Sequence, residues 1–312
     1  MNDTVSESAK FSNMGFICVC LVVLMHVHCP WEGGGINRLA VPFFFAMSGY
    51  FLAVHVDESG WYVRALSKRF RTLIIPLIIW CLIWAFFTIP LAIICNIHAG
   101  RELSSNILTG WEILRYLALD ITNTPALGPL WYVRCLFLFV LVSPLIVCLI
   151  RRGGLLVLLI LGCLYYTYSL RETPIRFLLF GFSLEGVFYF SLGMFFRMKH
   201  VPLALNPIIG IVIFCGGLLA YLNGLIVLSI ALMIVGLWGG MPARRFPRIL
   251  TSNTFPVYLL HMFVLVLFGN GKIASPLIAI GVGIVAIAVS VVIAELLRKL
   301  TPQFSAYIFG NR

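Results

Sequence analysis

The sequence predicts an all-α integral membrane protein, a bundle of about ten transmembrane helices with both termini on the cytoplasmic side. Of its 312 residues, 61% are hydrophobic and only 11% are charged, whereas a soluble domain is about half apolar and about a quarter charged. The apolar residues also gather in runs that approach the roughly 20 helical residues needed to cross a bilayer. The chain length leaves no room for a sizeable soluble domain beside such a bundle.

Ten apolar runs are predicted to form the helices. Their limits are 13–29, 36–55, 72–97, 127–150, 154–170, 177–197, 202–217, 219–237, 254–269 and 274–297. The separator CGGLLAYLNG is weak, so the seventh and eighth runs form either a hairpin or one long disturbed segment. Residues 1–12 and 301–312 are expected to be cytoplasmic tails that flank a transmembrane domain over 13–300.

The charges favour a membrane topology over a nucleic-acid partner. The net charge is +11, and most of the 22 lysines and arginines fall in the segments that an N-in, C-in arrangement places in the cytoplasm. No basic stripe is interleaved with stacking aromatic residues, so no nucleic acid is expected. The nine cysteines include no CxxC pair, and neither a disulfide framework nor a metal site is predicted.

Two histidines near the end of the first run, in LVVLMHVHCPW, are the first candidate functional residues. Polar side chains within a bilayer usually serve function, and imidazole suits a general base near neutral pH. Two positions along a helix amount to about 200°, so His26 and His28 cannot act as a pair. His26 is the candidate base, or a proton relay in a transporter, and His28 is expected to be peripheral.

Further polar residues lie inside the later runs. Arg134 should face a cavity or a partner and could hold an anionic or hydroxyl-rich ligand, with Trp131 on the same helix face; the alternative is snorkelling to the outer headgroups. Glu185 and His261 either line a site or make interhelical hydrogen bonds. Glu295 is predicted to form a local ion pair with a neighbouring basic residue. Ser48-Gly49 is expected to permit close helix packing.

A basic stripe precedes the third run, in WYVRALSKRFR. Arg64, Lys68 and Arg71 stand at i, i+4 and i+7, which is one face of a helix, and Arg69 adds a fourth charge. Several converging cations suit a polyphosphate ligand such as the nucleotide of coenzyme A. Attraction to anionic lipid, or topology alone, is the alternative explanation.

Six segments together resemble the membrane acyltransferase-3 family, which O-acylates bacterial surface polysaccharides, lipopolysaccharides and related acceptors. They are LVVLMH, VPFFFAMSGYFL, KRFRTLIIPLIIW, GPLWYVRCLFL, FYFSLGMFF and VYLLH. Each segment is mostly apolar, and their order and spacing carry the resemblance. The family typically has an arginine eleven residues before the first-span histidine. Gly15 stands there in this chain, and Arg38 and Arg134 are the candidates for that role.

The resemblance implies a multi-pass O-acyltransferase of the bacterial cytoplasmic (inner) membrane, with 13–300 as its acyltransferase domain. Its expected partners are acyl-CoA, with acetyl-CoA as the expected donor, a carbohydrate or glycolipid acceptor and the bilayer, without a metal. Direct transfer and a covalent acyl-histidine both stay open. The implied site residues are His26 and Arg134 for catalysis, Arg64, Lys68, Arg69 and Arg71 for the donor, and Arg38, Trp131, Glu185 and His261 for the acceptor.

Two other classes of protein fit parts of the pattern. A multi-span transporter or flippase would use the buried histidines, Arg134 and Glu185 as a proton or substrate path. No inverted repeat and no matching pair of broken spans supports that class. A non-catalytic binding protein that keeps the fold is the third class, and the glycine at position 15 is its best support.

Overall fold

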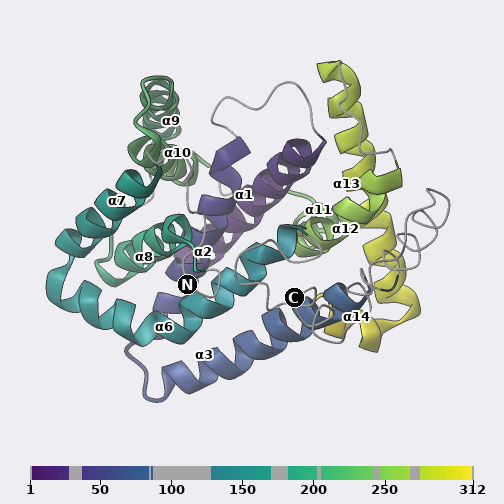
Figure 1. Cartoon of the computed structure of the whole chain (residues 1–312), viewed down its shortest axis with the longest axis horizontal. Coiled ribbons are helices and arrows are strands. Elements are labelled where there is room, and N and C mark those ends of the chain that lie inside the picture. The colour runs from purple at the N-terminus through teal and green to yellow at the C-terminus, as the bar shows by residue number, and fades with distance from the viewer. Residues whose placement is uncertain are drawn as a thin grey trace, which may run out of the picture.

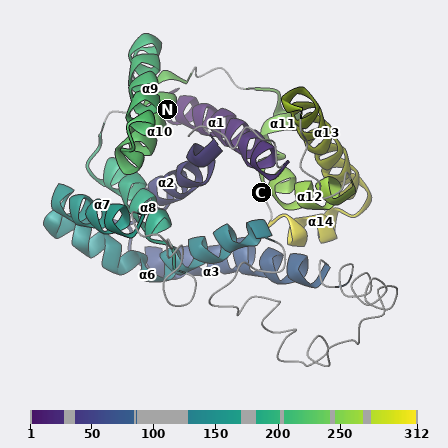
Figure 2. The ribbon, with the colours of Figure 1, turned by 45° about the horizontal axis from the view of Figure 1, so that its top comes forward.

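A computed structural model describes residues 2–27, 37–83, 86, 128–169, 182–201, 205–241, 246–267 and 275–310. Within these ranges the chain forms helices and no strand, which confirms the predicted all-α class (Figure 1). Figure 2 shows α1 in the middle, with α2, α7, α8, α9 and α10 on one side and α12 and α13 on the other. Helices α3 and α6 run together along a third side.

The observed helices overlap all ten predicted runs. Helix α3 begins at Trp61, not at residue 72, and leads through a π-helical segment, Phe70–Ile74, into helical residues 75–83. The helices are α1 (Asn2–His26), α2 (Ala40–Ala53), α3 (Trp61–Arg69), α6 (Trp131–Gly153), α7 (Leu155–Ser169), α8 (Leu184–Met198), α9 (Pro207–Leu222), α10 (Ile226–Gly240), α11 (Arg248–Thr251), α12 (Thr254–Leu267), α13 (Pro276–Leu300) and α14 (Pro302–Ile308).

Within the described residues, three helical stretches are long and apolar enough to cross a membrane, namely Ala9–His26, Trp131–Gly153 and Pro276–Leu300. Five shorter apolar helices accompany them: Ala40–Ala53, Leu155–Tyr168, Pro207–Leu222, Ile226–Gly240 and Thr254–Val266. Many of their large hydrophobic side chains are exposed on the outside of the bundle, as in Leu156, Ile208 and Leu277. Apolar surface of this extent is typical of a protein whose solvent is lipid. The chain is therefore a helical membrane protein.

The seventh and eighth predicted runs form a hairpin. Helices α9 and α10 are joined by a turn at Asn223 and Gly224, and Gly224 has φ +78°, which favours glycine. The two helices approach so closely that a Cβ on Gly210 would lie 2.5 Å from the Cα of Gly240. The break therefore falls after Leu222, beyond the Gly-Gly pair where the sequence predicted it.

Close backbone packing also joins α2 to α8. A Cβ on Gly49 would overlap the carbonyl oxygen of Phe190, and a Cβ on Gly193 would overlap that of Ala46. Only glycine permits this approach, as small residues do at helix interfaces in membranes. The packing role expected for Ser48-Gly49 is therefore confirmed at Gly49.

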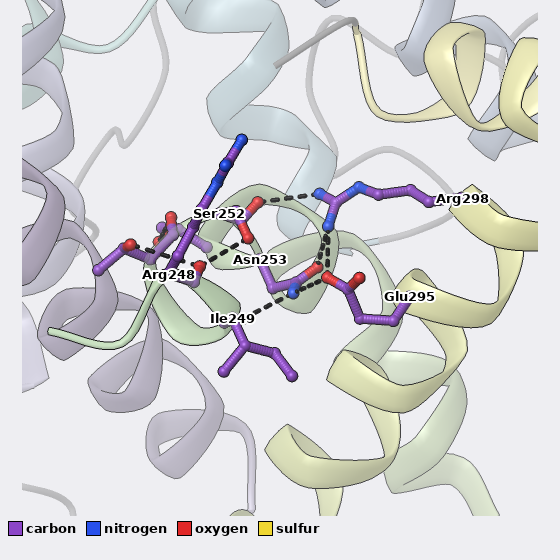
Figure 3. Close-up of polar contacts among 8 residues, drawn as sticks. Arg248, Ile249, Ser252, Asn253, Glu295 and Arg298 are labelled. Carbon is purple, nitrogen blue, oxygen red and sulfur yellow. Dashed lines mark hydrogen bonds and ion pairs between the residues drawn. The ribbon is translucent and has the colours of Figure 1, made fainter.

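A polar cluster fastens the start of α12 to the end of α13 (Figure 3). The buried Asn253 amide donates to the carbonyl oxygen of Ile249 at 2.7 Å and to Oε1 of Glu295 at 2.6 Å. Arg298 donates to Asn253 Oδ1 at 2.8 Å, to Glu295 Oε1 at 2.8 Å and to the carbonyl oxygen of Ser252 at 2.9 Å. The predicted local ion pair of Glu295 is thus confirmed, and it is one part of a larger network.

The C-terminal segment packs against the third helical segment. The indole Nε1 of Trp80 donates to the carbonyl oxygen of Ile308 at 2.9 Å, and Ile308 and Phe309 are buried. The guanidinium of Arg298 lies 5.8 Å from the centre of the Phe309 ring. Helix α14 therefore belongs to the packed body of the protein, and Phe309, the residue that follows it, contacts the same arginine that holds α12.

Candidate active site

Two histidines from different helices face each other within the bundle. His26 is the last residue of α1, and His261 lies in the middle of α12; their ring centres are 5.1 Å apart. Each ring is tied to its own helix. The Nδ1 of His26 is 2.8 Å from the carbonyl oxygen of Val22, and the Nδ1 of His261 is 3.1 Å from that of Val257.

These two contacts fix the tautomer of each neutral ring. A carbonyl oxygen only accepts hydrogen bonds, so each Nδ1 must carry the hydrogen and donate it. The lone pair of each neutral imidazole then resides on Nε2, on the far side of the ring from the helix backbone. His26 is therefore held in the form that a general base requires, with its basic nitrogen directed away from α1.

The two rings differ in access. His261 has 0% of its surface exposed, and its Nε2 has no hydrogen-bond partner among the described residues. His26 is only half-buried. A substrate group can therefore reach His26 and cannot reach His261 without rearrangement. His28 lies outside the described residues.

Aromatic side chains line the bundle next to this pair. The Tyr258 ring centre is 6.2 Å from that of His261, and the Tyr132 ring centre is 5.8 Å from that of Tyr258. The Tyr132 hydroxyl lies 3.4 Å from Ser48 Oγ, and the Tyr258 hydroxyl donates to the carbonyl oxygen of Pro129. Neither tyrosine was predicted from the sequence. The available signal was spacing, because Tyr258 precedes His261 by three positions and shares its helix face.

Arg69 lies between the basic stripe of α3 and the aromatic side chains Tyr132 and Tyr258. It is half-buried at the end of α3, immediately before the π-helical segment, and its charge interacts with the Tyr132 hydroxyl. Widened turns of this kind occur frequently at functional sites. Of the four residues predicted for the donor, Arg69 is thus the one that the structure turns toward the interior.

The other three basic residues are exposed. Arg64 donates to Glu58 Oε2 at 2.7 Å and to the carbonyl oxygen of Ser59 at 2.6 Å. His55 donates from Nδ1 to the other carboxylate oxygen of Glu58 at 2.7 Å. These two partners lower the pKa of the Glu58 carboxyl, the hydrogen bond from His55 contributing most. Lys68 and Arg71 stay exposed on the same segment.

Arg134 is buried in the first turns of α6, with 8% of its surface exposed. Its Nε and Nη2 atoms are enclosed, and its charge interacts with the buried thiols of Cys81 and Cys135. The guanidinium thus lies in the interior and not at the headgroup surface. A permanent charge at such a depth is costly to maintain and is usually functional.

A second polar group gathers at the start of α8. Ser183 caps this helix by accepting from the Gly186 N–H at 3.0 Å, which places Glu185 in the first turn. The Tyr165 hydroxyl of α7 donates to Glu185 Oε1 at 3.0 Å, and the charge of Arg38, exposed just before α2, also interacts with Tyr165. Glu185 therefore contacts Tyr165, and the charge of Arg38, a second predicted acceptor residue, acts on the same tyrosine. Trp131 is not part of this group; the centre of its ring lies 6.1 Å from that of Phe45.

Gly15 packs beside the start of α12. A Cβ at this position would lie 3.7 Å from the Thr254 methyl group and 3.8 Å from the Phe44 ring. The guanidinium bound at this end of α12 is that of Arg298, which contacts Ser252 and Asn253. Arg298 was considered from the sequence only as a neighbour of Glu295.

No group of three or more histidine, cysteine, aspartate or glutamate side chains is placed to hold a metal ion within the described part of the chain. The groups available for chemistry there are the imidazole pair, the arginines and the tyrosine hydroxyls. These groups transfer protons and stabilise negative charge.

An imidazole pair between the helices of a membrane protein is an arrangement that proton carriers and group-transfer enzymes can both use. Residues 13–295 match the acyltransferase domain family, so the chain belongs to this family, as its motifs predicted. It is also similar to the succinoglycan biosynthesis protein ExoH of Rhizobium meliloti (strain 1021), with 27% identity over 349 residues that cover 98% of this chain and 92% of the relative. No solved structure matches the chain.

Proposed function

We propose that the protein transfers an acyl group, with acetyl-CoA as donor, to a hydroxyl of an exported or surface carbohydrate at the bacterial inner membrane, which it crosses several times. Family membership over 13–295 supports the acyl transfer. The role of the similar protein ExoH in succinoglycan biosynthesis supports a polysaccharide acceptor. The observation that carries the proposal is the geometry of His26, a half-buried imidazole whose Nδ1–H is bound to Val22 and whose Nε2 carries the lone pair.

The proposed acyl transfer starts from the basic Nε2 of His26. The acceptor hydroxyl oxygen attacks the thioester carbonyl carbon while His26 Nε2 takes the hydroxyl proton. The resulting oxyanion needs a positive or hydrogen-bonding group close by, and buried Arg134 is the proposed one. When the intermediate collapses, the carbon–sulfur bond breaks, and the proton on His26 passes to the departing thiolate. His26 is then neutral again.

The donor is proposed to reach this centre along α3. Its phosphates would bind Arg69, Lys68 and Arg71, because cations at one helix end suit a polyphosphate. Arg64 now binds Glu58, so phosphate would have to compete with a carboxylate for it. Both partners of this ion pair are more than half exposed, and exposed pairs of this kind are weak. The competition therefore costs the donor little.

The acceptor is proposed to bind at the group formed by Arg38, Tyr165 and Glu185, with Trp131 and the half-buried His26 leading toward the transfer centre. A carboxylate and a tyrosine hydroxyl offer an acceptor and a donor to sugar hydroxyls. Aromatic faces offer a flat apolar surface with a polar edge. This combination fits a neutral or anionic carbohydrate.

The test is thioester turnover by the purified protein in lipid nanodiscs, with release of free coenzyme A from acetyl-CoA followed over time. We expect His26→Ala to lower kcat by about 10²- to 10⁴-fold, the usual contribution of a general base. The control is Met25→Ala, which alters the adjacent and exposed side chain and should leave turnover within about twofold, as expected for an exposed site away from the chemistry. Equal turnover in wild type and His26→Ala, or no binding of acetyl-CoA to the wild type, would refute the proposal.

A further inference from the structure

We infer that Ser48, Arg69 and Tyr132 form a subsite for one phosphate of the donor, the phosphate at which its pantetheine arm begins. The inference rests on the proposed function and names the part of acetyl-CoA that these residues recognise. It is carried by two buried hydroxyl groups that the proposed transfer does not use, and by a half-buried arginine whose charge reaches one of them.

Three helices bring these groups together. Ser48 lies in α2, Tyr132 in the first turn of α6 and Arg69 at the end of α3. The Tyr132 hydroxyl is 3.4 Å from Ser48 Oγ, and both residues are buried. The charge of Arg69 acts on the same tyrosine. A few polar groups that converge from different elements inside an apolar surrounding are typical of a ligand site.

The course of α3 along α6 explains how a basic residue comes near this hydroxyl pair. At the start of α3, the Tyr62 hydroxyl donates to the carbonyl oxygen of Leu141 at 3.1 Å. Just beyond the end of α3, the ring centres of Phe70 and Phe137 are 6.2 Å apart. The two helices therefore run side by side in opposite directions (Figure 2). The last residue of α3 is thus carried toward the first turns of α6, where the tyrosine of the pair lies.

Two hydroxyls and a guanidinium suit a phosphate group. The contact between the Ser48 and Tyr132 hydroxyls is longer than the typical bond between hydroxyls of about 2.8 Å, so it is weak and can give way to a better acceptor. A phosphate oxygen is such an acceptor, because hydrogen bonds to a charged group are about twice as strong as neutral ones. The guanidinium of Arg69 would balance the negative charge of that phosphate.

The position of the pair selects which phosphate of the donor binds there. A row of rings leads to the proposed base, with centre-to-centre steps of 5.8, 6.2 and 5.1 Å; the rings are those of Tyr132, Tyr258, His261 and His26. The straight distance between the first and last rings cannot exceed the total of these steps. The pantetheine arm has about as many bonds as four extended residues and reaches roughly 14 Å. It can therefore bring the thioester to His26, while the exposed Lys68 and Arg71 hold the phosphates of the nucleotide.

Three ligands of decreasing length test the subsite by binding alone. Coenzyme A and phosphopantetheine contain the phosphate in question, and pantetheine lacks it. Their dissociation constants are measured by isothermal titration calorimetry with the purified protein in nanodiscs of phosphatidylcholine. This lipid has no net charge, so no anionic headgroup competes for the basic residues.

The expected pattern depends on the phosphate. Tyr132→Phe should weaken the binding of coenzyme A and of phosphopantetheine about 10- to 100-fold, which is the range for a hydrogen bond to a charged group, and should change the affinity for pantetheine by less than about twofold. Ser48→Ala should show the same pattern. The matched control is Tyr62→Phe, which removes a hydroxyl from the other end of the contact between α3 and α6 and should leave all three affinities within about twofold.

Three results for Tyr132→Phe would overturn the inference. Binding of coenzyme A as tight as in the wild type would show that the hydroxyl does not bind phosphate. An equal loss for phosphopantetheine and pantetheine would show an effect on the path of the arm or on the fold. A loss confined to coenzyme A would place the hydroxyl at another phosphate. If the wild type binds none of the three ligands, the proposed function fails as well, so the two failures are distinguishable.

Discussion

Replacing Arg298 by alanine probes how α12, which carries His261, is fixed in place. The guanidinium makes two hydrogen bonds to neutral groups, Asn253 Oδ1 at 2.8 Å and the Ser252 carbonyl oxygen at 2.9 Å. Hydrogen bonds from a charged donor contribute about 1.5–3 kcal/mol each. The third bond, to Glu295, counts for little, because the Glu295 side chain is 43% exposed and water screens the pair.

The expected loss follows from these terms. Two charge-assisted hydrogen bonds amount to at least about 3 kcal/mol, and release of the arginine side chain from its ordered state returns up to about 2 kcal/mol of rotamer entropy. The alanine also removes the contact of the guanidinium with the Phe309 ring, which is about 0.5–1 kcal/mol. The net destabilisation is therefore about 2 kcal/mol.

The assay is chemical unfolding of the purified protein in a fixed lipid–detergent mixture, and the control is Lys299→Ala. Lys299 is the next residue along α13 and is exposed, so its removal should change the free energy of unfolding by less than about 0.5 kcal/mol. Arg298→Lys should fall between the two, because lysine keeps the charge and loses the planar set of donors. If Arg298→Ala unfolds like Lys299→Ala, the cluster does not hold α12 and the reasoning is refuted.

Three further predictions concern helix packing, the acceptor and pH. Gly193→Val should destabilise the protein by at least about 1–3 kcal/mol, because the new side chain would overlap α2. Gly216→Val, whose side chain enters open space, should not destabilise it. Denaturant unfolding compares the two variants, and an equal loss of unfolding free energy would contradict the close packing of α2 on α8. Tyr165→Phe removes the donor to the α8 carboxylate and should raise the acceptor KM several-fold without changing the acetyl-CoA KM, in steady-state kinetics. Because His55 and Arg64 lower the pKa of Glu58 below 4.5, the protection factor of the backbone N–H groups of residues 54–60, which is corrected for the intrinsic exchange rate at each pH, should decrease only as the pH falls below 4.5. A decrease already near pH 6 would contradict the prediction.

The class of the protein was predictable, and the polar candidates inside its helices could be picked out, because both depend on local composition. Runs of apolar residues predict membrane helices wherever they occur, and a histidine inside such a run stands out by its cost. His26, His261 and Arg134 were therefore identified as candidates from residue type alone. Glu295 was paired correctly because its partner lies within one helical turn.

The partnerships between helices were not predictable in the same way. His26 and His261 lie at opposite ends of the chain, and no local pattern states that α1 packs on α12. Tyr132 resembles any aromatic residue of an apolar run until the fold brings it within electrostatic reach of Arg69 at the end of α3. Arg64 seemed available for a ligand, because the fold of the turn that presents Glu58 to it could not be foreseen from charge spacing.

Element boundaries failed where charge and hydropathy disagreed. The segment from Trp61 to Arg69 is rich in charge, so the third run was expected to start at residue 72, yet it is helical throughout. Its i, i+4 spacing was sound as a helix pattern. The π-helical segment that follows, Phe70–Ile74, changes the rotation of the later residues. Arg71 lies within this segment, so its direction relative to Arg64 and Lys68 does not follow from α-helical spacing.

The most direct test of the central role of His26 is the O-acyl content of the surface polysaccharide in cells that express this protein at equal membrane levels. Polysaccharide from cells with wild type and from cells with Met25→Ala should carry the acyl group. Polysaccharide from cells with His26→Ala should lack it, as nuclear magnetic resonance or mass spectrometry would show. Full acylation by His26→Ala would contradict the role of this histidine as the base of the transfer.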